Sequence, residues 1–471
     1  MSANLSFFSK SRTAFFVLSG IALGSLIAFS SYAAVFVLLG LASALFVSKS
    51  PLRALSFLIL LIPFTETSYL KDAFIAVPGV KPMNILAVFV AIIALVNHES
   101  AQKFPTYSMI FAFLFLSLFG ISIFRSLPHL DVINALRENE LSPLRYLLSD
   151  LVKPLIYFMP FVITVLFIKK RVSLKLVTSA VGFSLGLLAA YQLYLCAFKI
   201  PDIRDVDEAS KYYSFTLGMH RNDLANFYIL GFPAILGRFF LKKGVISISA
   251  LLLVIIATGF LFSRTAYFGL LLSFVLYLVF SKRAKLLPVF LAALLGLSLI
   301  VSSTITERAS KGFKSGNWDE IFAGRIVSIW LPLVDECLKD PIKLLFGNGR
   351  YAILSSECAA RGTILESIEH PHNMYLEQVL DAGVCGLITV LAFFAILLRK
   401  CYNASRNSNE FVLAEYYHIV TVTIISYFFA GMTGRSLFPT LSNSYLWVIA
   451  GLAIALNRLS ENAKQERNKE A

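Results

Sequence analysis

The sequence predicts an all-α integral membrane protein, a polytopic bundle of 12–14 transmembrane helices with one large, partly helical external loop. Of its 471 residues, 57% are hydrophobic and only 15% are charged. A soluble chain of this size divides into cores with polar exteriors and cannot cover so much apolar surface. The apolar residues also form repeated runs near the length of about 20 residues that a bilayer-spanning helix needs.

Fourteen apolar runs are candidates for spans, and 12 is the alternative count, because the third and fourth runs are short enough to be tilted or re-entrant. The first run lacks a small-residue cleavage site followed by a polar chain, so we expect it to be retained. The runs are 14–30, 32–47, 54–66, 84–97, 106–124, 151–168, 174–198, 223–240, 245–262, 266–281, 286–303, 376–398, 412–431 and 438–456.

The polar segments divide the chain into one membrane domain over 1–456 and a charged tail over 457–471, which we expect to be disordered. The membrane domain includes the longest polar stretch, a loop over 304–375. An even number of spans places both termini on one side of the membrane. Segments 67–83, 125–150 and 199–222 then share the opposite side with the large loop.

The cations are distributed unequally between the two sides. The side with the termini carries 22 Lys and Arg against 6 Asp and Glu, whereas the other side carries 20 against 22. Short loops rich in Lys and Arg mark the cytoplasmic face, so both termini are predicted to be cytoplasmic. The net charge of +14 therefore reports topology and gives no support for nucleic-acid binding.

Several classes of site find no support in the sequence. No CxxC pair occurs, and neither His370 nor His372 has a cysteine at ligand spacing, so we predict no metal. Gly-rich phosphate loops are absent as well, and we predict no cofactor. Cys337 and Cys358 are the only cysteines of the large loop. An oxidising compartment would favour a disulfide between them, and two unpaired thiols are the alternative.

The large loop contains one amphipathic pattern. Apolar residues recur at helical spacing from Ile326 to Leu338, and Pro332 is expected to be the first residue of the better helix. This helix would lie on the membrane surface or pack on its own bundle, and the pattern does not decide between the two.

Two arginines at external ends of spans are candidates for phosphate binding. Arg221 precedes the run at 223–240, and Arg264 precedes the run at 266–281. A guanidinium stays protonated and offers several fixed donors to phosphate oxygens. The alternative for each is contact with lipid headgroups or with a nearby carboxylate.

His372 lies on the same predicted side, directly before the run at 376–398. Asn373 is a good N-cap for that helix, and a helix start offers free backbone N–H groups and a positive dipole end to a phosphate. An imidazole beside an anion site can accept a proton from a sugar hydroxyl. A simple capping or interfacial histidine is the alternative, and His370 leaves open which imidazole is active.

The order of these motifs resembles the O-antigen ligase/polymerase superfamily of bacterial inner-membrane glycosyltransferases. The resemblance covers roughly 215–400 and rests on these pieces: Arg221–Ala225, Ser263–Arg264, Gly324–Arg325 with Trp330, Gly347–Gly349, and His372–Leu376 followed by Gly383 and Gly386. The family usually has about 12 spans, fewer than the 14 runs counted above.

By resemblance, His372 is the catalytic base and Arg264 holds the pyrophosphate of the donor. Arg221, Arg325 and Asn373 are expected to contact the pyrophosphate or the glycan. The resemblance implies metal-independent transfer of a glycan, en bloc, from undecaprenyl pyrophosphate to a hydroxyl in the periplasm.

The specific prediction is an O-antigen ligase of the bacterial inner membrane, whose acceptor is a sugar of lipid A–core and whose site faces the periplasm. A polymerase that joins carrier-linked repeat units is the nearest alternative, followed by an oligosaccharyltransferase that modifies protein hydroxyls. A non-enzymatic flippase for lipid-linked glycans would need charged residues deep in its spans, and the sequence has essentially none at span centres.

Overall fold

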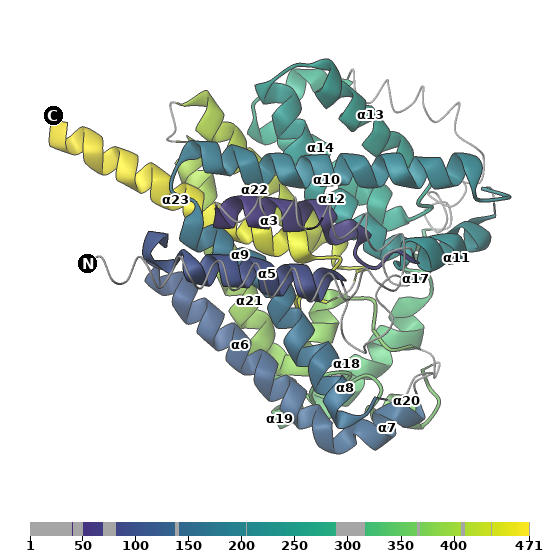
Figure 1. Cartoon of the computed structure of the whole chain (residues 1–471). Coiled ribbons are helices and arrows are strands. Elements are labelled where there is room, and N and C mark those ends of the chain that lie inside the picture. Colours follow the sequence, from purple (N-terminus) through teal and green to yellow (C-terminus); the bar gives the residue numbers. More distant parts are fainter. Residues whose placement is uncertain are drawn as a thin grey trace, which may run out of the picture.

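The computed structural model describes residue 40 and residues 50–68, 82–136, 141–203, 205–288, 316–364, 368–406, 410–434 and 436–470. Within these ranges the chain forms helices and no strand, and the long helices pack side by side in one bundle (Figure 1). The prediction of an all-α membrane protein is confirmed.

The helices follow one another in the order expected from the apolar runs. They are α3 (Pro51–Leu61), η1 (Ile62–Phe64), α5 (Pro82–Val96), η2 (His98–Ser100), α6 (Thr106–Ser126), η3 (Leu127–His129), α7 (Leu130–Ala135), α8 (Pro143–Leu147), the π-helical η4 (Leu148–Val152), α9 (Lys153–Phe167), α10 (Arg171–Phe198), α11 (Val206–Thr216), α12 (Arg221–Leu241), α13 (Val245–Gly259), α14 (Arg264–Phe280), η5 (Ala284–Leu286), α17 (Trp318–Ile321), the π-helical η6 (Ile326–Trp330), α18 (Leu331–Lys339), α19 (Pro341–Phe346), α20 (Glu357–Ala360), α21 (Met374–Arg406), α22 (Phe411–Ala430) and α23 (Ser444–Glu470).

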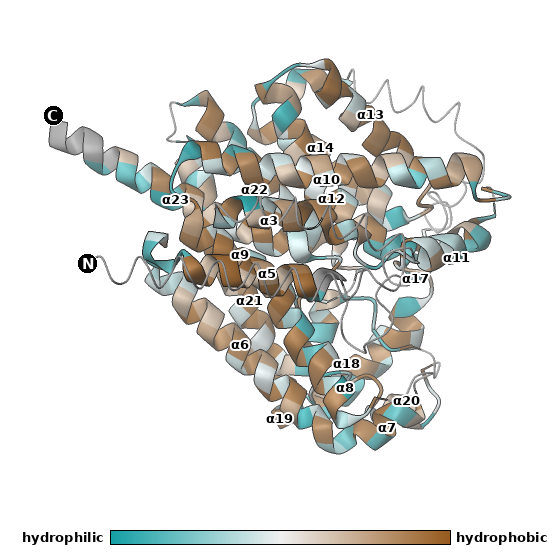
Figure 2. Cartoon of the chain, viewed as in Figure 1, coloured by the Kyte–Doolittle hydropathy of each residue, from teal (hydrophilic) through white to brown (hydrophobic). Residues whose placement is uncertain are grey.

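In the described part of the chain, six helical stretches are long and apolar enough to cross a membrane: Thr106–Ala135, Pro143–Phe167, Arg171–Phe198, Arg221–Leu241, Met374–Arg406 and Phe411–Ala430. Shorter apolar helices correspond to the expected spans at 54–66, 84–97, 245–262 and 266–281. The expected span 14–30, and nearly all of 32–47 and 286–303, lie outside the described residues. Hydrophobic residues predominate along the long helices, whereas hydrophilic residues gather around α11 and α17 (Figure 2).

The expectation of a disordered tail is wrong. Helix α23 begins inside the bundle and continues through the charged residues to Glu470, extending beyond its neighbours (Figure 1). The tail has no proline or glycine between Asn457 and Glu470, so nothing in its sequence breaks a helix that the buried first half has already nucleated. Low hydrophobicity alone therefore does not predict disorder for residues 457–470.

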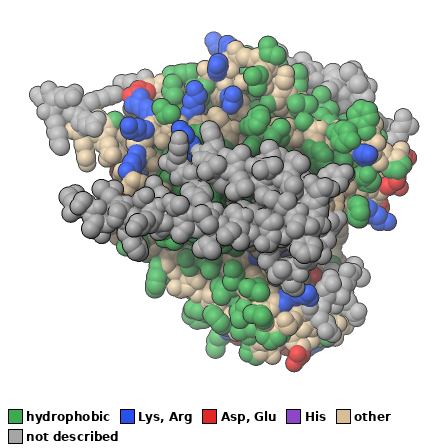
Figure 3. Space-filling view, in the orientation of Figure 1, with side chains coloured by type: hydrophobic (Ala, Val, Ile, Leu, Met, Phe, Trp, Pro, Cys, Tyr) green, Lys and Arg blue, Asp and Glu red, His purple; other side chains and the backbone are tan. Residues whose placement is uncertain are grey.

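Contacts at one end of the bundle join segments that the charge pattern assigned to the cytoplasmic side. Arg458 donates to the carbonyl oxygens of Val165 and Ile168, both at 2.8 Å. Arg171 pairs with Glu410 at 2.5 Å. Many visible Lys and Arg side chains lie on the left of Figure 3, beside α23. The packing therefore agrees with the predicted grouping of loops.

Helix α12 lies at the centre of this packing, and every residue from Leu224 to Gly237 is buried. Its neighbours are α10, α13, α14 and α22. Gly237 and Gly231 permit the close approach, because a Cβ on Gly237 would come within 2.4 Å of the Ile419 side chain. A helix held this firmly fixes the position of Arg221, its first residue.

Candidate active site

The starts of α12 and α14 are joined, and each carries a predicted arginine. Arg221 is the first residue of α12, and Arg264 is the first residue of α14. Ser263, the N-cap residue of α14, makes no side-chain capping bond. Its hydroxyl instead donates to Asn222 Oδ1 at 3.2 Å, so the two helix starts are tied together beside both arginines.

Arg325 joins the same group from the large loop. Burial, followed by the positive charges of Arg264 and Arg221, lowers the pKa of Arg325 to about 10. Guanidinium groups repel one another in this way only over short distances, so the three arginines form one cationic cluster. Arg264 Nη1 also donates to the backbone oxygen of Glu320, at 3.2 Å, which attaches the loop to α14. We refer to Arg221, Arg264 and Arg325 as the arginine cluster.

The start of α21, which carries His372 and Asn373, is brought to the same end. Thr265 Oγ1, next to Arg264, lies 2.7 Å from Thr433 Oγ1. Met374 N donates to the oxygen of Gly431 at 2.9 Å. A Cβ on Gly431 would come within 2.1 Å of the Met374 sulfur, so a larger residue there would displace the Met374 side chain. The turn at 431–433 therefore holds the starts of α14 and α21 together.

Asn373 caps α21, as predicted: its Oδ1 accepts from Tyr375 N at 3.0 Å and from Leu376 N at 3.2 Å. Glu377 N donates to the Asn373 carbonyl at 2.9 Å, and Met374 N is engaged by Gly431. The expectation that this helix start presents free N–H groups is therefore wrong. The N–H groups of residues 374–377 all have protein partners, because the cap and the 431–433 turn occupy them.

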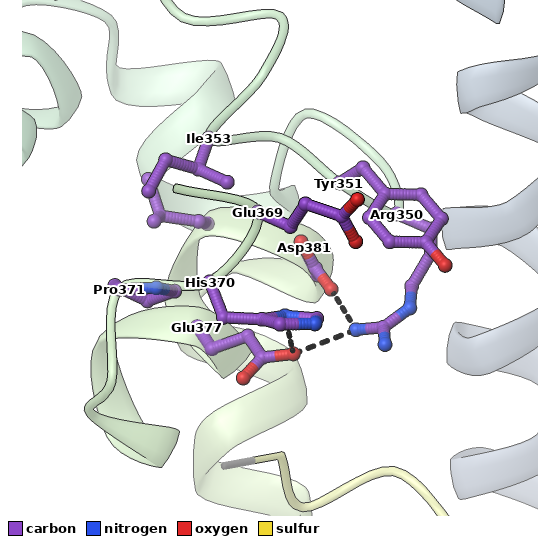
Figure 4. A pocket seen from close by; sticks show the side chains of 9 residues that line it. Arg350, Tyr351, Ile353, Glu369, His370, Pro371, Glu377 and Asp381 are labelled. Atoms are coloured by element: carbon purple, nitrogen blue, oxygen red, sulfur yellow. Dashed lines mark hydrogen bonds and ion pairs between the residues drawn. The ribbon is translucent and has the colours of Figure 1, made fainter. Parts of the chain in front are cut away.

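The two histidines differ in their surroundings. His370 Nδ1 lies 3.4 Å from Glu377 Oε1, and the imidazole faces a small space lined by Arg350, Tyr351 and Asp381 (Figure 4). His372 is half-buried and has φ +54°, a left-handed conformation that is uncommon for residues other than glycine. His370 thus belongs to an ion-pair network, whereas His372 lies between that network and the cap.

The centre of the network is Arg350, which the sequence analysis missed. Its Nη1 lies 2.8 Å from Glu377 Oε1 and 2.7 Å from Asp381 Oδ2, and its Nε lies 3.7 Å from Asp150 Oδ1. Burial disfavours the guanidinium cation, but Asp381 and the other nearby carboxylates outweigh it and raise the pKa of Arg350. Arg350 is 8% exposed and Asp381 2%, so these charges are buried and paired.

A signal for this network was present in the sequence. Glu377 and Asp381 are four residues apart, and they lie on one face of a helix beneath His372. Gly347 and Gly349 precede Arg350, with φ +74° and +99°. A Cβ on Gly347 would come within 2.5 Å of the Asp381 backbone, which explains why a glycine-rich segment lies here.

The kink of α21 completes this arrangement. Gly383 has φ +73°, and a Cβ there would come within 2.1 Å of Leu345 O. Near the kink, the carbonyl oxygens of Leu380 and Asp381 accept from Asn348 N at 2.7 Å and Gly349 N at 3.2 Å. The backbone of the large loop is therefore hydrogen-bonded to α21 just below the histidines.

The amphipathic helix of the loop is present, with α18 beginning at Leu331, one residue before the expected Pro332. Ile329 of the preceding η6 and Leu333 of α18 are buried, which supports packing on the bundle. Val334 and Leu338 remain 40% and 64% exposed, so part of the apolar surface is not covered by this chain.

The disulfide considered between Cys337 and Cys358 is not formed, and both residues are free cysteines. Cys358 Sγ instead donates to Pro332 O at 3.4 Å. Glu336 lies beside both thiols, and its carboxylate accepts from Cys358 N at 3.0 Å. Burial, followed by the charge of the neighbouring Glu336, raises the pKa of Cys337 to about 11. Among the described residues, no three His, Cys, Asp or Glu side chains are grouped as a metal site would require.

The fold and this site define a class: a polytopic membrane protein in which three arginines and a histidine are gathered at one end of the bundle. Residues 249–391 match the family model described as O-antigen ligase. This match over part of the chain supports the O-antigen ligase/polymerase superfamily, which the sequence motifs also indicated. The matched range includes Arg264, Arg325, His372 and Asn373, whereas Arg221 lies before it. No curated protein matches the chain.

Proposed function

We propose that this protein is an O-antigen ligase-like glycosyltransferase of the bacterial inner membrane. It moves a glycan en bloc from undecaprenyl pyrophosphate to a sugar hydroxyl of lipid A–core, at the periplasmic face. The observation that carries the proposal is the joint attachment of α14 and α21 to the turn at 431–433, through Thr433 and Gly431. This attachment holds the helix starts beside Arg264 and His372 at one end of the bundle, which supports a shared site.

In the proposed reaction, the arginine cluster binds the pyrophosphate of the donor. The bond between the anomeric carbon and the pyrophosphate oxygen breaks, and the bonding electrons leave with that oxygen. Three guanidinium groups already crowded together gain a counter-charge when the anion binds, which offsets their mutual repulsion. Preorganised donors of this kind act most strongly on the charge that develops on the leaving oxygen.

His372 acts on the other reactant. Its imidazole accepts the proton of the acceptor hydroxyl while the hydroxyl oxygen bonds to the anomeric carbon. We assign the base to His372 because it lies directly before the α21 cap, beside the turn at 431–433 that also holds the start of α14. Asn373 supports the site as the cap that fixes the backbone after His372, and direct contact with the glycan is a further role we propose for it.

The test is a deletion of the gene in its own organism, followed by electrophoresis of lipopolysaccharide and of carrier-linked glycan. A ligase deletion leaves polymer of normal length on the carrier and none on lipid A–core. Single repeats on lipid A–core would instead identify a polymerase. Unchanged lipopolysaccharide would contradict both readings. Proteins that lack their glycans would then indicate an oligosaccharyltransferase, and lipid-linked glycan that accumulates on the cytoplasmic side would indicate a flippase.

A further inference from the structure

Trp330 connects the large loop to the backbone beside His372. Its indole Nε1 donates to the Pro371 carbonyl oxygen at 2.8 Å. Trp330 is the last residue of η6 and its ring packs near Phe322, with 5.2 Å between ring centroids. The indole is therefore held from within the loop, and its N–H points at the residue that precedes His372.

The other end of η6 adjoins the arginine cluster. Arg325 is the residue directly before η6, and Asp319 Oδ1 accepts from Ile326 N at 2.9 Å and from Val327 N at 3.2 Å. The adjacent Glu320 accepts from Arg264 at 3.2 Å. A single turn of π-helix thus runs from the arginine cluster to the histidine, and π-helical turns occur frequently at functional sites.

His372 needs such support, because its left-handed backbone is costly. A residue other than glycine in this conformation is strained and persists only where its surroundings enforce it. Here the chain is held on both sides of His372. Trp330 holds the carbonyl of Pro371, and the cap by Asn373 together with the bond from Met374 to Gly431 holds the following residues.

We propose that Trp330 is a positioning residue, whose indole N–H fixes His372 at the correct place relative to the arginine cluster. This inference rests on the proposed function, since it assigns Trp330 a task in that reaction. Misplacement of a catalytic group by about 1 Å costs roughly a hundredfold in rate. The N–H matters for the transfer step, whereas the aromatic ring serves packing.

The first experiment compares Trp330→Phe with Trp318→Phe in the purified full-length protein. Phenylalanine keeps a ring but has no N–H to donate. Trp318 lies in the same loop and is 69% exposed, so it is the matched control. With a carrier-linked glycan as donor and lipid A–core as acceptor, we expect Trp330→Phe to lower kcat about tenfold to a hundredfold. The KM for the donor stays within about twofold, and Trp318→Phe changes neither constant.

The second experiment introduces Trp330→Phe into a His372→Ala protein. If Trp330 acts through His372, the second substitution changes the residual rate by less than about twofold, because groups that act as a unit are non-additive. A full additional loss in that background overturns the proposal, as does a raised KM with unchanged kcat, or a Trp330→Phe kcat within twofold of the wild type.

Folding and function are separable in this design. If Trp330→Phe lowers the unfolding temperature markedly, benzothienylalanine at position 330 replaces it, since it keeps the shape of tryptophan with sulfur in place of N–H. Wild-type kcat with that residue overturns the inference. If His372→Ala itself keeps the wild-type rate, the proposed function of His372 fails, and the role of Trp330 fails with it. If His372→Ala is inactive and Trp330→Phe is normal, only the role of Trp330 fails.

Discussion

Arg350 Nη1 lies 2.7 Å from Asp381 Oδ2, and both side chains are almost entirely buried. The pair joins the large loop to α21, one turn beyond Glu377, which contacts His370 at 3.4 Å. Arg350 also lies 5.0 Å from the ring centroids of both Tyr351 and Phe438. The loop is therefore a fixed part of the bundle at this point.

Arg350→Met should destabilise the protein severely. The substitution leaves Glu377 and Asp381 buried without their guanidinium partner, and breaking a buried ion pair in this way costs about 3–5 kcal/mol. The measurement is the unfolding temperature in detergent, together with the yield of folded protein. Arg361→Ala is the control, because the Arg361–Glu357 pair is exposed and should contribute about 0.5 kcal/mol or less. Equal unfolding temperatures for the two variants would contradict the assigned role of Arg350.

Arg325→Gln should stabilise the empty protein and weaken the binding of pyrophosphate. Burial, followed by the charges of Arg264 and Arg221, lowers the pKa of Arg325 to about 10. A folded-state pKa below the unfolded value means that the unfolded chain binds the proton more tightly. The charged Arg325 side chain thus lowers the free energy of unfolding by its full amount at neutral pH. This destabilisation is relieved only as the pH rises through about 10 and the guanidinium loses its proton in the folded state.

The check is the unfolding temperature at pH 7 with and without inorganic pyrophosphate. Without the anion, we expect Arg325→Gln to unfold about 2–4 °C higher, which corresponds to roughly 1 kcal/mol in a large domain. With the anion, the wild type should gain more stability than the variant does. An equal gain in both proteins would show that Arg325 does not contact the anion.

Arg264→Lys should lose about a hundredfold or more in transfer rate while the protein inserts and folds normally. An ammonium keeps the charge, but it loses the planar fork that matches phosphate oxygens. The rate is measured with purified protein and carrier-linked glycan. Arg361→Lys, an exposed substitution in the same loop, is the control and should remain within about twofold of the wild type. Full activity of Arg264→Lys would contradict the prediction, because it would show that a positive charge at this position is enough.

Reporter fusions test the assignment of sides. A fusion after Gly362, where the chain is exposed and φ is +68°, should report the periplasm. A fusion after Lys285 should report the cytoplasm, since the short loops with excess cations remain there. The opposite result at either position would move the candidate site to the other side of the membrane.

The apolar runs predicted most of the helices because a bilayer imposes length and hydrophobicity on every span. The predicted arginines also came together, since each sits at a helix start or a turn on the same predicted side. The network of Arg350 was missed because its members lie far apart in sequence, at 150, 350 and 377–381. The helical tail was missed because local composition does not reveal that α23 is nucleated by its buried half.

The hydrogen-bond partners of the N–H groups at the start of α21 could not be predicted from the sequence either. Asn373 predicted a cap correctly, but the bond from Met374 N to Gly431 O depends on a turn more than fifty residues away. Such a long-range contact has no local signature, so a helix start that looked open to a phosphate is closed by the protein itself.

The central claim is that His372 is the base that activates the acceptor, and the most direct test is the transfer rate of His372→Ala beside His370→Ala. Both are measured with purified, folded protein, carrier-linked glycan and lipid A–core. The loss of a positioned base typically lowers the rate about a hundredfold to ten-thousandfold, so we expect His372→Ala to be nearly inactive. His370→Ala should keep most of its activity, because Arg350 and Ser436 N still contact Glu377. Wild-type transfer by His372→Ala, with or without a loss in His370→Ala, would contradict the account.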